Sequence, residues 1–199
     1  SPKIDEMKAQ AASQLRMIEV ATGGGEHAAM FVERITNLIV QPIEPDEAAH
    51  ASIKAWAEDA CSSSKVLVPL AVDICELNAS DLPPDFLPAQ CMLCVNMIHI
   101  SSWKSTEKLF RAAAALLEPN GKLWTYGPYQ EGGGMVASNA AFDTSLKERN
   151  PDWGIRHIED VKTAANQWGL LLGQRIEMPA NNLLLEWQVS SGSADSRAV

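Results

Sequence analysis

Short apolar runs alternate along the chain with segments in which apolar residues recur at helical spacing. The runs are continuously apolar rather than alternating, which is typical of parallel strands buried on both faces of a sheet. A proline ends the second run. The pattern predicts five strands, at residues 16–21, 37–42, 65–73, 90–100 and 122–129.

The segments between these runs predict helices. The clearest covers residues 105–121, where Ser105 or Thr106 can cap the start and Pro119 to Gly121 end the helix. Residues 74–90 contain three prolines and little periodicity, so we expect mostly loop there. The other expected helices cover residues 3–15, 26–35, 44–60, 138–149 and 158–168.

Two further apolar runs, 170–178 and 182–189, are separated by a turn-like spacer and predict an antiparallel hairpin. Strands that alternate with helices predict an α/β fold with a doubly wound, Rossmann-like parallel sheet. By analogy of topology, a closing hairpin matches the seven-stranded sheet of class I methyltransferases, whose last strand is antiparallel. We expect one domain over residues 1–189 and a disordered tail at 190–199.

The charge of the chain narrows the range of partners. A net charge of −9 over 199 residues, without a cluster of Lys and Arg, argues against nucleic acid and against a membrane surface. No apolar run approaches the ~20 residues that span a bilayer. Cys91 and Cys94 are interpreted as buried strand residues, because no second ligand pair completes a zinc site. We therefore expect a cytoplasmic protein without a metal that acts on a small molecule, and the oligomeric state stays open.

Three consecutive glycines separate the first expected strand from the next helix. Gly23 and Gly25 form a GxG that lets a ligand approach the backbone, and the helix N-terminus beyond it offers free N–H groups. Both a dinucleotide and S-adenosylmethionine fit such a loop. The position of the third dinucleotide glycine holds Ala28, which is a mild departure.

Acidic residues around this loop favour S-adenosylmethionine. Glu19, inside the first strand, would repel a pyrophosphate but not the ammonium group of S-adenosylmethionine. Glu44 lies 19 residues after Gly25, close to the spacing of about 20 residues expected for an acid that binds ribose; the other interpretation is that it begins the next helix. Asp73 either faces the adenine or is a solvated loop acid. No second nucleotide half-site follows the fifth strand, which disfavours NAD(P).

Several unusual sequence strings are distributed along the chain. They are EVATGGGEHA, QPIE, CVNMIHISSW, TYGPY, SNAAFD, RNPDWGIR and MPANN. With these strings the sequence resembles the methyltransferase-like family that includes methyltransferase-like 26, from about residue 2 to residue 187, nearly the whole chain. The resemblance implies a class I methyltransferase fold and a cofactor pocket for S-adenosylmethionine, with S-adenosylhomocysteine as the product.

The chain departs from the pattern of this family at three places. Glu44 stands where aspartate is usual, Ser102 replaces a proline, and His157 replaces an aspartate. The first change keeps a carboxylate that can reach a ribose. The last exchanges a carboxylate for an imidazole, which raises the prospect of a specialised substrate or another reaction.

Candidate residues for the chemistry follow the fourth and fifth strands, where ligands bind in doubly wound folds. His99 is the candidate general base, with a structural histidine as the alternative. Asn96 and His27 are candidates for the cofactor site, and Tyr126 is a second catalytic candidate. Candidate substrate-binding residues are Trp103, Tyr129, Asn139, Trp153 and Arg156.

Three functions remain open at this point. The first is a methyltransferase that uses S-adenosylmethionine on a small molecule. The second keeps the fold and the pocket without methyl transfer, as a binding scaffold or an enzyme of another reaction such as a cyclisation or elimination. The third is an NAD(P)-dependent oxidoreductase.

Overall fold

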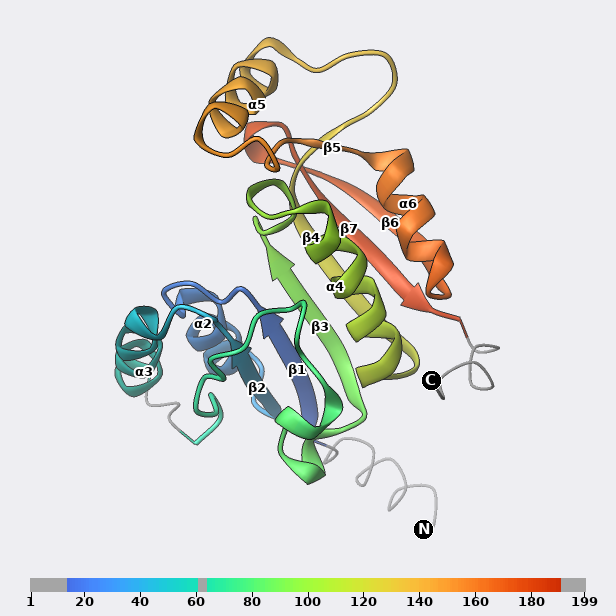
Figure 1. Cartoon of the computed structure of the whole chain (residues 1–199). Coiled ribbons are helices and arrows are strands. Elements are labelled where there is room, and N and C mark those ends of the chain that lie inside the picture. Colours follow the sequence, from blue (N-terminus) through green and yellow to red (C-terminus); the bar gives the residue numbers. More distant parts are fainter. Residues whose placement is uncertain (1–13, 61–63, 191–199) are drawn as a thin grey trace.

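A computed structural model describes residues 14–60 and 64–190, which form one mixed sheet with helices on both faces (Figure 1). The sheet order is β2-β1-β3-β4-β7-β6, and the short β5 pairs with the end of β4. The strands are β1 (Leu15–Val20), β2 (Leu38–Ile43), β3 (Ala89–Val95), β4 (Leu117–Gln130), β5 (Arg156–His157), β6 (Leu170–Met178) and β7 (Asn182–Val189).

Five α-helices of eight or more residues accompany the sheet in this part of the chain. They are α2 (Glu26–Arg34), α3 (His50–Asp59), α4 (Trp103–Leu116), α5 (Ala137–Arg149) and α6 (Ile158–Gln167). All five fall where helical spacing predicts them. The helix expected at 3–15 and the tail expected at 190–199 lie, apart from residues 14, 15 and 190, outside the described residues.

Alternate strand residues build two separate hydrophobic cores. In β1, Met17 packs with the α2 and α3 core, whereas Ile18 packs with the core under α4 and α6. In β3, Leu93 and Met92 divide in the same way. Because both faces are covered, the strands need apolar residues at consecutive positions, which explains the continuous runs of the sequence.

The expected antiparallel closure of the sheet is confirmed. β7 lies between β4 and β6 and is antiparallel to both. Its Trp187 is fully buried, packs edge-on against Phe110 of α4, and donates an indole N–H to Thr125 Oγ1 at 3.0 Å. The α/β, class I methyltransferase-like sheet predicted from the sequence is therefore the observed fold class.

The strand expected at 65–73 is wrong in extent. This segment forms only two isolated parallel bridges with β2, Val40 to Val66 and Ile43 to Leu70. Between them, the side-chain amide of Gln41 donates to the Val68 carbonyl at 2.9 Å, and Pro69 has no N–H to donate. The backbone ladder is interrupted for both reasons.

The segment after β3 also differs from the expectation. The strand ends at Val95, and His99 lies in a 3₁₀ turn (Ile98–Ile100) rather than in the strand. Helix α4 begins at Trp103 with Ser102 as its N-cap, so Ser105 and Thr106 are not the caps. It ends at Leu116 because residues 117–121 join β4.

The glycine loop carries a strict steric requirement at its last position. Gly25 has φ +94° and is the N-cap of α2. A Cβ at this position would lie 2.6 Å from the Ile53 Cα of α3, which is too close for two carbon atoms that are not bonded to each other. Only glycine lets α2 and α3 pack at this distance.

We expect Gly25→Ala to lower the free energy of unfolding by at least about 2 kcal/mol, because left-handed strain adds to the contact with the α3 backbone. Thermal or urea unfolding measures the loss. Gly132→Ala is the matched control, because Gly132 has φ +61° and open space around its Cβ position. Equal losses in the two variants would contradict the steric explanation.

Candidate functional site

The turn between β1 and α2 presents bare backbone at the carboxyl end of the sheet. Gly23 has φ +61°, and nothing lies within 4 Å of the position that its Cβ would take. Ser52 Oγ of α3 donates to the Gly24 carbonyl at 2.9 Å, which ties the loop to α3. A ligand can therefore approach the loop at Gly23 without meeting a side chain.

Glu44, directly after β2, is tied to this loop. Its Oε2 accepts the Gly23 N–H at 2.8 Å and its Oε1 accepts the Asp46 N–H at 3.0 Å. The residue is buried, yet each carboxylate oxygen retains acceptor capacity, because a carboxylate has about four lone-pair sites. Two oxygens that are fixed side by side match the two neighbouring hydroxyl groups of a ribose.

Glu19 lies beneath the loop with an unsatisfied carboxyl group. It is 1 % exposed, and its buried Oε2 has no hydrogen-bond partner among the described residues. Its Oε1 lies 3.8 Å from His27 Nδ1, in the first turn of α2. Burial raises the pKa of Glu19 to about 8, so the carboxyl is mostly protonated at neutral pH. A ligand with a positive charge would satisfy the orphaned oxygen, and the residues present fit the ammonium group of S-adenosylmethionine in this respect.

Asp73 lies beyond the second bridge of the 66–70 segment. It is exposed, and its Oδ1 accepts the Cys75 N–H at 2.7 Å. The backbone N–H of Glu44 donates to the Leu70 carbonyl at 3.0 Å, so the two acids follow neighbouring extended segments. Asp73 is thus available at the same edge of the sheet as Glu44.

A second group of residues surrounds His99 beside the glycine loop. The register pairs Val20 of β1 with Cys94 of β3, so the segments that follow these strands are neighbours. His99 lines a cavity of about 510 Å³, together with side chains from the end of β4, from α5 and from the corner between β6 and β7. The other lining residues are Asn96, Pro128, Ser138, Asn139, Phe142, Ala180, Asn181 and Asn182.

The imidazole of His99 is held in its neutral form. The residue is 5 % exposed, and its ring packs edge-on against Phe142 with 5.6 Å between ring centroids. Burial, followed by the positive charges of Arg156 and Arg149, lowers the pKa of His99 to about 4. At neutral pH the ring therefore offers one N–H donor and one nitrogen acceptor.

Arg156 fixes the turn that carries His99. Its guanidinium donates to the backbone carbonyls of Ile98 at 3.3 Å, Ser101 at 2.7 Å and Asp152 at 2.7 Å. Its predicted role was to bind substrate. The observed contacts use Nε and Nη2, so the residue joins the 150–157 segment to the His99 turn, and substrate binding by Arg156 stays a prediction.

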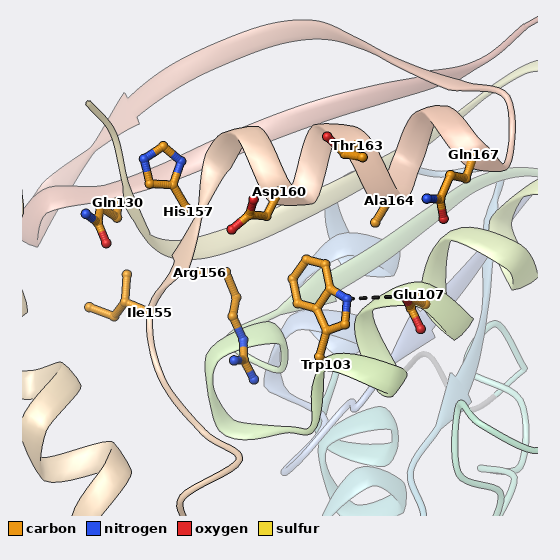
Figure 2. A pocket seen from close by; sticks show the side chains of 10 residues that line it. All are labelled: Trp103, Glu107, Gln130, Ile155, Arg156, His157, Asp160, Thr163, Ala164 and Gln167. Carbon is orange, nitrogen blue, oxygen red and sulfur yellow. Dashed lines mark hydrogen bonds between the residues drawn. The ribbon is translucent and has the colours of Figure 1, made fainter. Parts of the chain in front are cut away.

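Trp103 and Arg156 line a different cavity from His99, between α4 and α6 (Figure 2). Its volume is about 580 Å³. The Trp103 indole N–H donates to Glu107 Oε1 at 3.2 Å, and the Arg156 guanidinium lies 5.9 Å from the centre of the indole ring. Figure 2 shows the indole pointing toward α6, whose Asp160 and Thr163 face it across the cavity.

The remaining predicted residues are distributed around these cavities. Tyr129 is buried and donates to Thr125 Oγ1 at 2.8 Å, and burial raises its pKa above the usual range. The Tyr126 hydroxyl accepts from Asn182 Nδ2 at 3.1 Å, one residue away from the His99 cavity. Trp153 stacks beneath the guanidinium of Arg149, 5.4 Å from the ring centre. The structure thus brings Asn96, His99 and Asn139 together around one cavity, and Trp103 and Arg156 together around another.

Sequence reasoning missed part of the wall of the His99 cavity. Ser138 and Phe142 lie in the string SNAAFD and Ala180 in MPANN, but neither string indicates that the two segments meet. They reach the same cavity because α5 lies beside the β6–β7 corner (Figure 1). The Asn181 carbonyl accepts from Asn139 Nδ2 at 3.3 Å, which joins these two elements.

A family model described as "Protein of unknown function (DUF938)" matches residues 3–189. The chain belongs to this family. The match covers nearly all of the sheet and the helices described above, including both groups of candidate residues.

Several solved structures of other proteins have the same fold as this DUF938 chain. The mitomycin 7-O-methyltransferase MmcR has a TM-score of 0.76 at 14% identity, over 90% of this chain and 50% of that one. The S-adenosylmethionine-dependent methyltransferase SibL has a TM-score of 0.73 at 17% identity, over 96% of this chain and 55% of that one. An O-methyltransferase family protein from Burkholderia thailandensis has a TM-score of 0.76 at 18% identity, over 96% of this chain and 56% of that one. At these identities the likeness concerns the fold, and the chain spans about half the length of these proteins.

No helix among the described residues of this DUF938 chain has the length and apolar character needed to cross a membrane.

We expect Arg156→Gln to raise the pKa of His99 from about 4 toward its ordinary value of 6.5, because a nearby positive charge that opposes protonation is removed. An NMR titration of the imidazole resonances measures the shift. The free energy of unfolding of the wild type should also fall as the pH is lowered from about 6.5 to 4, because in this range the unfolded chain binds a proton at His99 and the folded chain does not. Arg111→Gln, an exposed arginine on α4, is the control. An unchanged His99 titration in Arg156→Gln would contradict this account.

The buried carboxyl of Glu19 predicts the opposite pH dependence. Between about pH 4.5 and 8 the folded state keeps a proton that the unfolded state releases, so rising pH favours unfolding. Glu19→Gln should remove this loss, which is at most about 1.4 kcal/mol per pH unit. Melting temperatures from pH 5 to 8 test it, with Glu33→Gln on the surface of α2 as the control. Parallel profiles for wild type and Glu19→Gln would refute the assignment.

Proposed function

We propose that the protein transfers the methyl group of S-adenosylmethionine to a small molecule and releases S-adenosylhomocysteine. The observation that carries the proposal is the carboxylate of Glu44, held on the bare backbone of Gly23 with acceptor capacity remaining on both oxygens. This arrangement suits a ribose diol next to a glycine loop.

Each end of the cofactor has a counterpart in the chain. Glu44 would accept hydrogen bonds from both ribose hydroxyls, and the orphaned oxygen of Glu19 would face the ammonium group. Asp73 follows the 66–70 segment beside β2 and is the candidate for the adenine, and Asn96 follows β3 beside β1 and is the candidate for the cofactor rim. Gly23 and Gly25 keep this surface free of side chains.

The acceptor site of the proposal is the His99 cavity. Bound S-adenosylmethionine would supply a methyl group on a positively charged sulfur. Methyl transfer is an in-line displacement, so the chain contributes chiefly by placing the acceptor atom. Neutral His99 would take a hydrogen bond from the acceptor and pass its proton to water. Tyr126 would act through Asn182.

The likeness to named methyltransferases supports this proposal at the level of the fold. SibL is named as dependent on S-adenosylmethionine, and MmcR as an O-methyltransferase of mitomycin. The closer resemblance to the methyltransferase-like 26 family and the cytoplasmic location are parts of the same proposal. The carboxylate of Glu44 would repel the 2′-phosphate of NADP, which disfavours an NADP-dependent enzyme.

Calorimetry with S-adenosylhomocysteine tests the cofactor site. We expect Glu44→Ala to weaken binding about 100-fold, because two charge-assisted hydrogen bonds to the ribose are lost. Glu47→Ala removes an exposed acid from the same segment and should leave the affinity unchanged. Equal affinities of wild type and Glu44→Ala would remove the ribose assignment, and binding of NADP alone would refute the function.

Incubation of the protein with methyl-labelled S-adenosylmethionine and a metabolite extract tests the reaction itself. Label in a small-molecule product is the expected result. Binding of S-adenosylhomocysteine without any transfer of label would instead favour a binding scaffold or another reaction in the same pocket.

A further inference from the structure

The cavity beside His99 has no charged side chain in its wall. His99, Phe142, Pro128 and Ala180 share the lining with five amide or hydroxyl residues, which are Asn96, Ser138, Asn139, Asn181 and Asn182. The chain as a whole carries 41 acidic and basic residues (25 and 16), yet none of them lines this cavity at the carboxyl end of the sheet. The uncharged wall therefore favours uncharged ligands. A charged molecule would lose its hydration there without gaining a counter-charge.

We propose that this cavity binds an uncharged hydroxyaromatic compound, a phenol or a related enol, as the methyl acceptor. The inference rests on the proposed function and specifies the substrate class of its acceptor site. It excludes carboxylates and ammonium compounds as good ligands of this cavity.

The apolar part of the wall fits the ring of such a compound. Phe142 is 39% exposed although it is a large aromatic residue, and its ring lies against His99. Pro128 and Ala180 contribute further apolar surface from β4 and from the β6–β7 corner. An aromatic ring placed against Phe142 would cover surface that the folded chain leaves open.

The polar part of the wall fits a hydroxyl group. His99 is nine-tenths buried and lines the cavity, and its ring nitrogens have no hydrogen-bond partner among the described residues. A hydroxyl group can give its proton to one ring nitrogen or accept from the other. The amide nitrogens of Asn139 and Asn182 are already donors within the protein, so their oxygens remain as acceptors for a second donor on the ligand.

A phenol or an enol also differs from an alcohol in its acidity. It gives up its proton more readily, so neutral His99 can accept that proton more easily. In the reaction, the phenolic oxygen bonds to the methyl carbon as the carbon–sulfur bond breaks. The electron pair of that bond stays on sulfur, and the phenolic proton leaves through His99 to water.

Three probes with one ring system test the inference: 2-naphthol, 2-naphthoate and 2-naphthylmethylammonium. Calorimetry is run with and without S-adenosylhomocysteine. We expect 2-naphthol to bind at least tenfold more tightly than either charged probe. Phe142→Ala should weaken 2-naphthol about tenfold, whereas Trp168→Ala, which removes an equally exposed aromatic residue outside the cavity wall, should not.

A charge introduced into the wall provides the converse test. Asn182→Asp keeps the shape and can still form a hydrogen bond with Tyr126. This substitution should strengthen the binding of 2-naphthylmethylammonium at least tenfold and weaken the binding of 2-naphthol. The inference is overturned if a charged probe binds wild type as well as 2-naphthol does, or if 2-naphthol fails to bind in both conditions. Failure of S-adenosylhomocysteine to bind would overturn the proposed function instead, since the probes report on the cavity without it.

Discussion

The hydrogen bond of 2.8 Å from the Gly23 amide to the Glu44 carboxylate is the contact on which the candidate site depends. It joins the segments that follow β1 and β2, next to the hydrogen bond of 3.2 Å from the Thr22 N–H to the Ile43 carbonyl. Gly25 sets the approach of α2 to α3, and this packing in turn places the glycine loop over Glu19. A bare loop, a fixed carboxylate and an unsatisfied buried oxygen thereby converge within a few residues of the sheet edge.

Arg156 plays the corresponding part for the other half of the site. A single guanidinium holds three backbone carbonyls from two separate segments, so the turn of His99 cannot shift independently of residues 152–156. Burial, followed by the charges of Arg156 and Arg149, keeps the imidazole neutral. Arg156 therefore contributes both to the position and to the protonation of His99, although it lies outside the His99 cavity.

The fold followed from sequence patterns because each strand is short, apolar and bounded by helical segments. The glycine loop, Glu19 and Glu44 were predictable from local spacing along the first two strands. The third strand was overestimated, because a side chain of β2, Gln41, takes a carbonyl that periodicity cannot assign. The wall of the His99 cavity required contacts between residues about 40 positions apart, such as Asn139 with Asn181, which no local pattern encodes. Arg156 was predicted at the site, but its backbone contacts were not.

The corner between β6 and β7 places two successive non-glycine residues, Ala180 at φ 59° and Asn181 at φ 56°, in the left-handed region. Such a conformation costs free energy and persists only when neighbours impose it. Here the neighbours belong to α5, through Ser138 and Asn139. Widening the mouth of the cavity by moving α5 would release the corner at the same time. The left-handed bend and the wall of the cavity therefore depend on the same contacts with α5, so a substitution at Ser138 or Asn139 would disturb both.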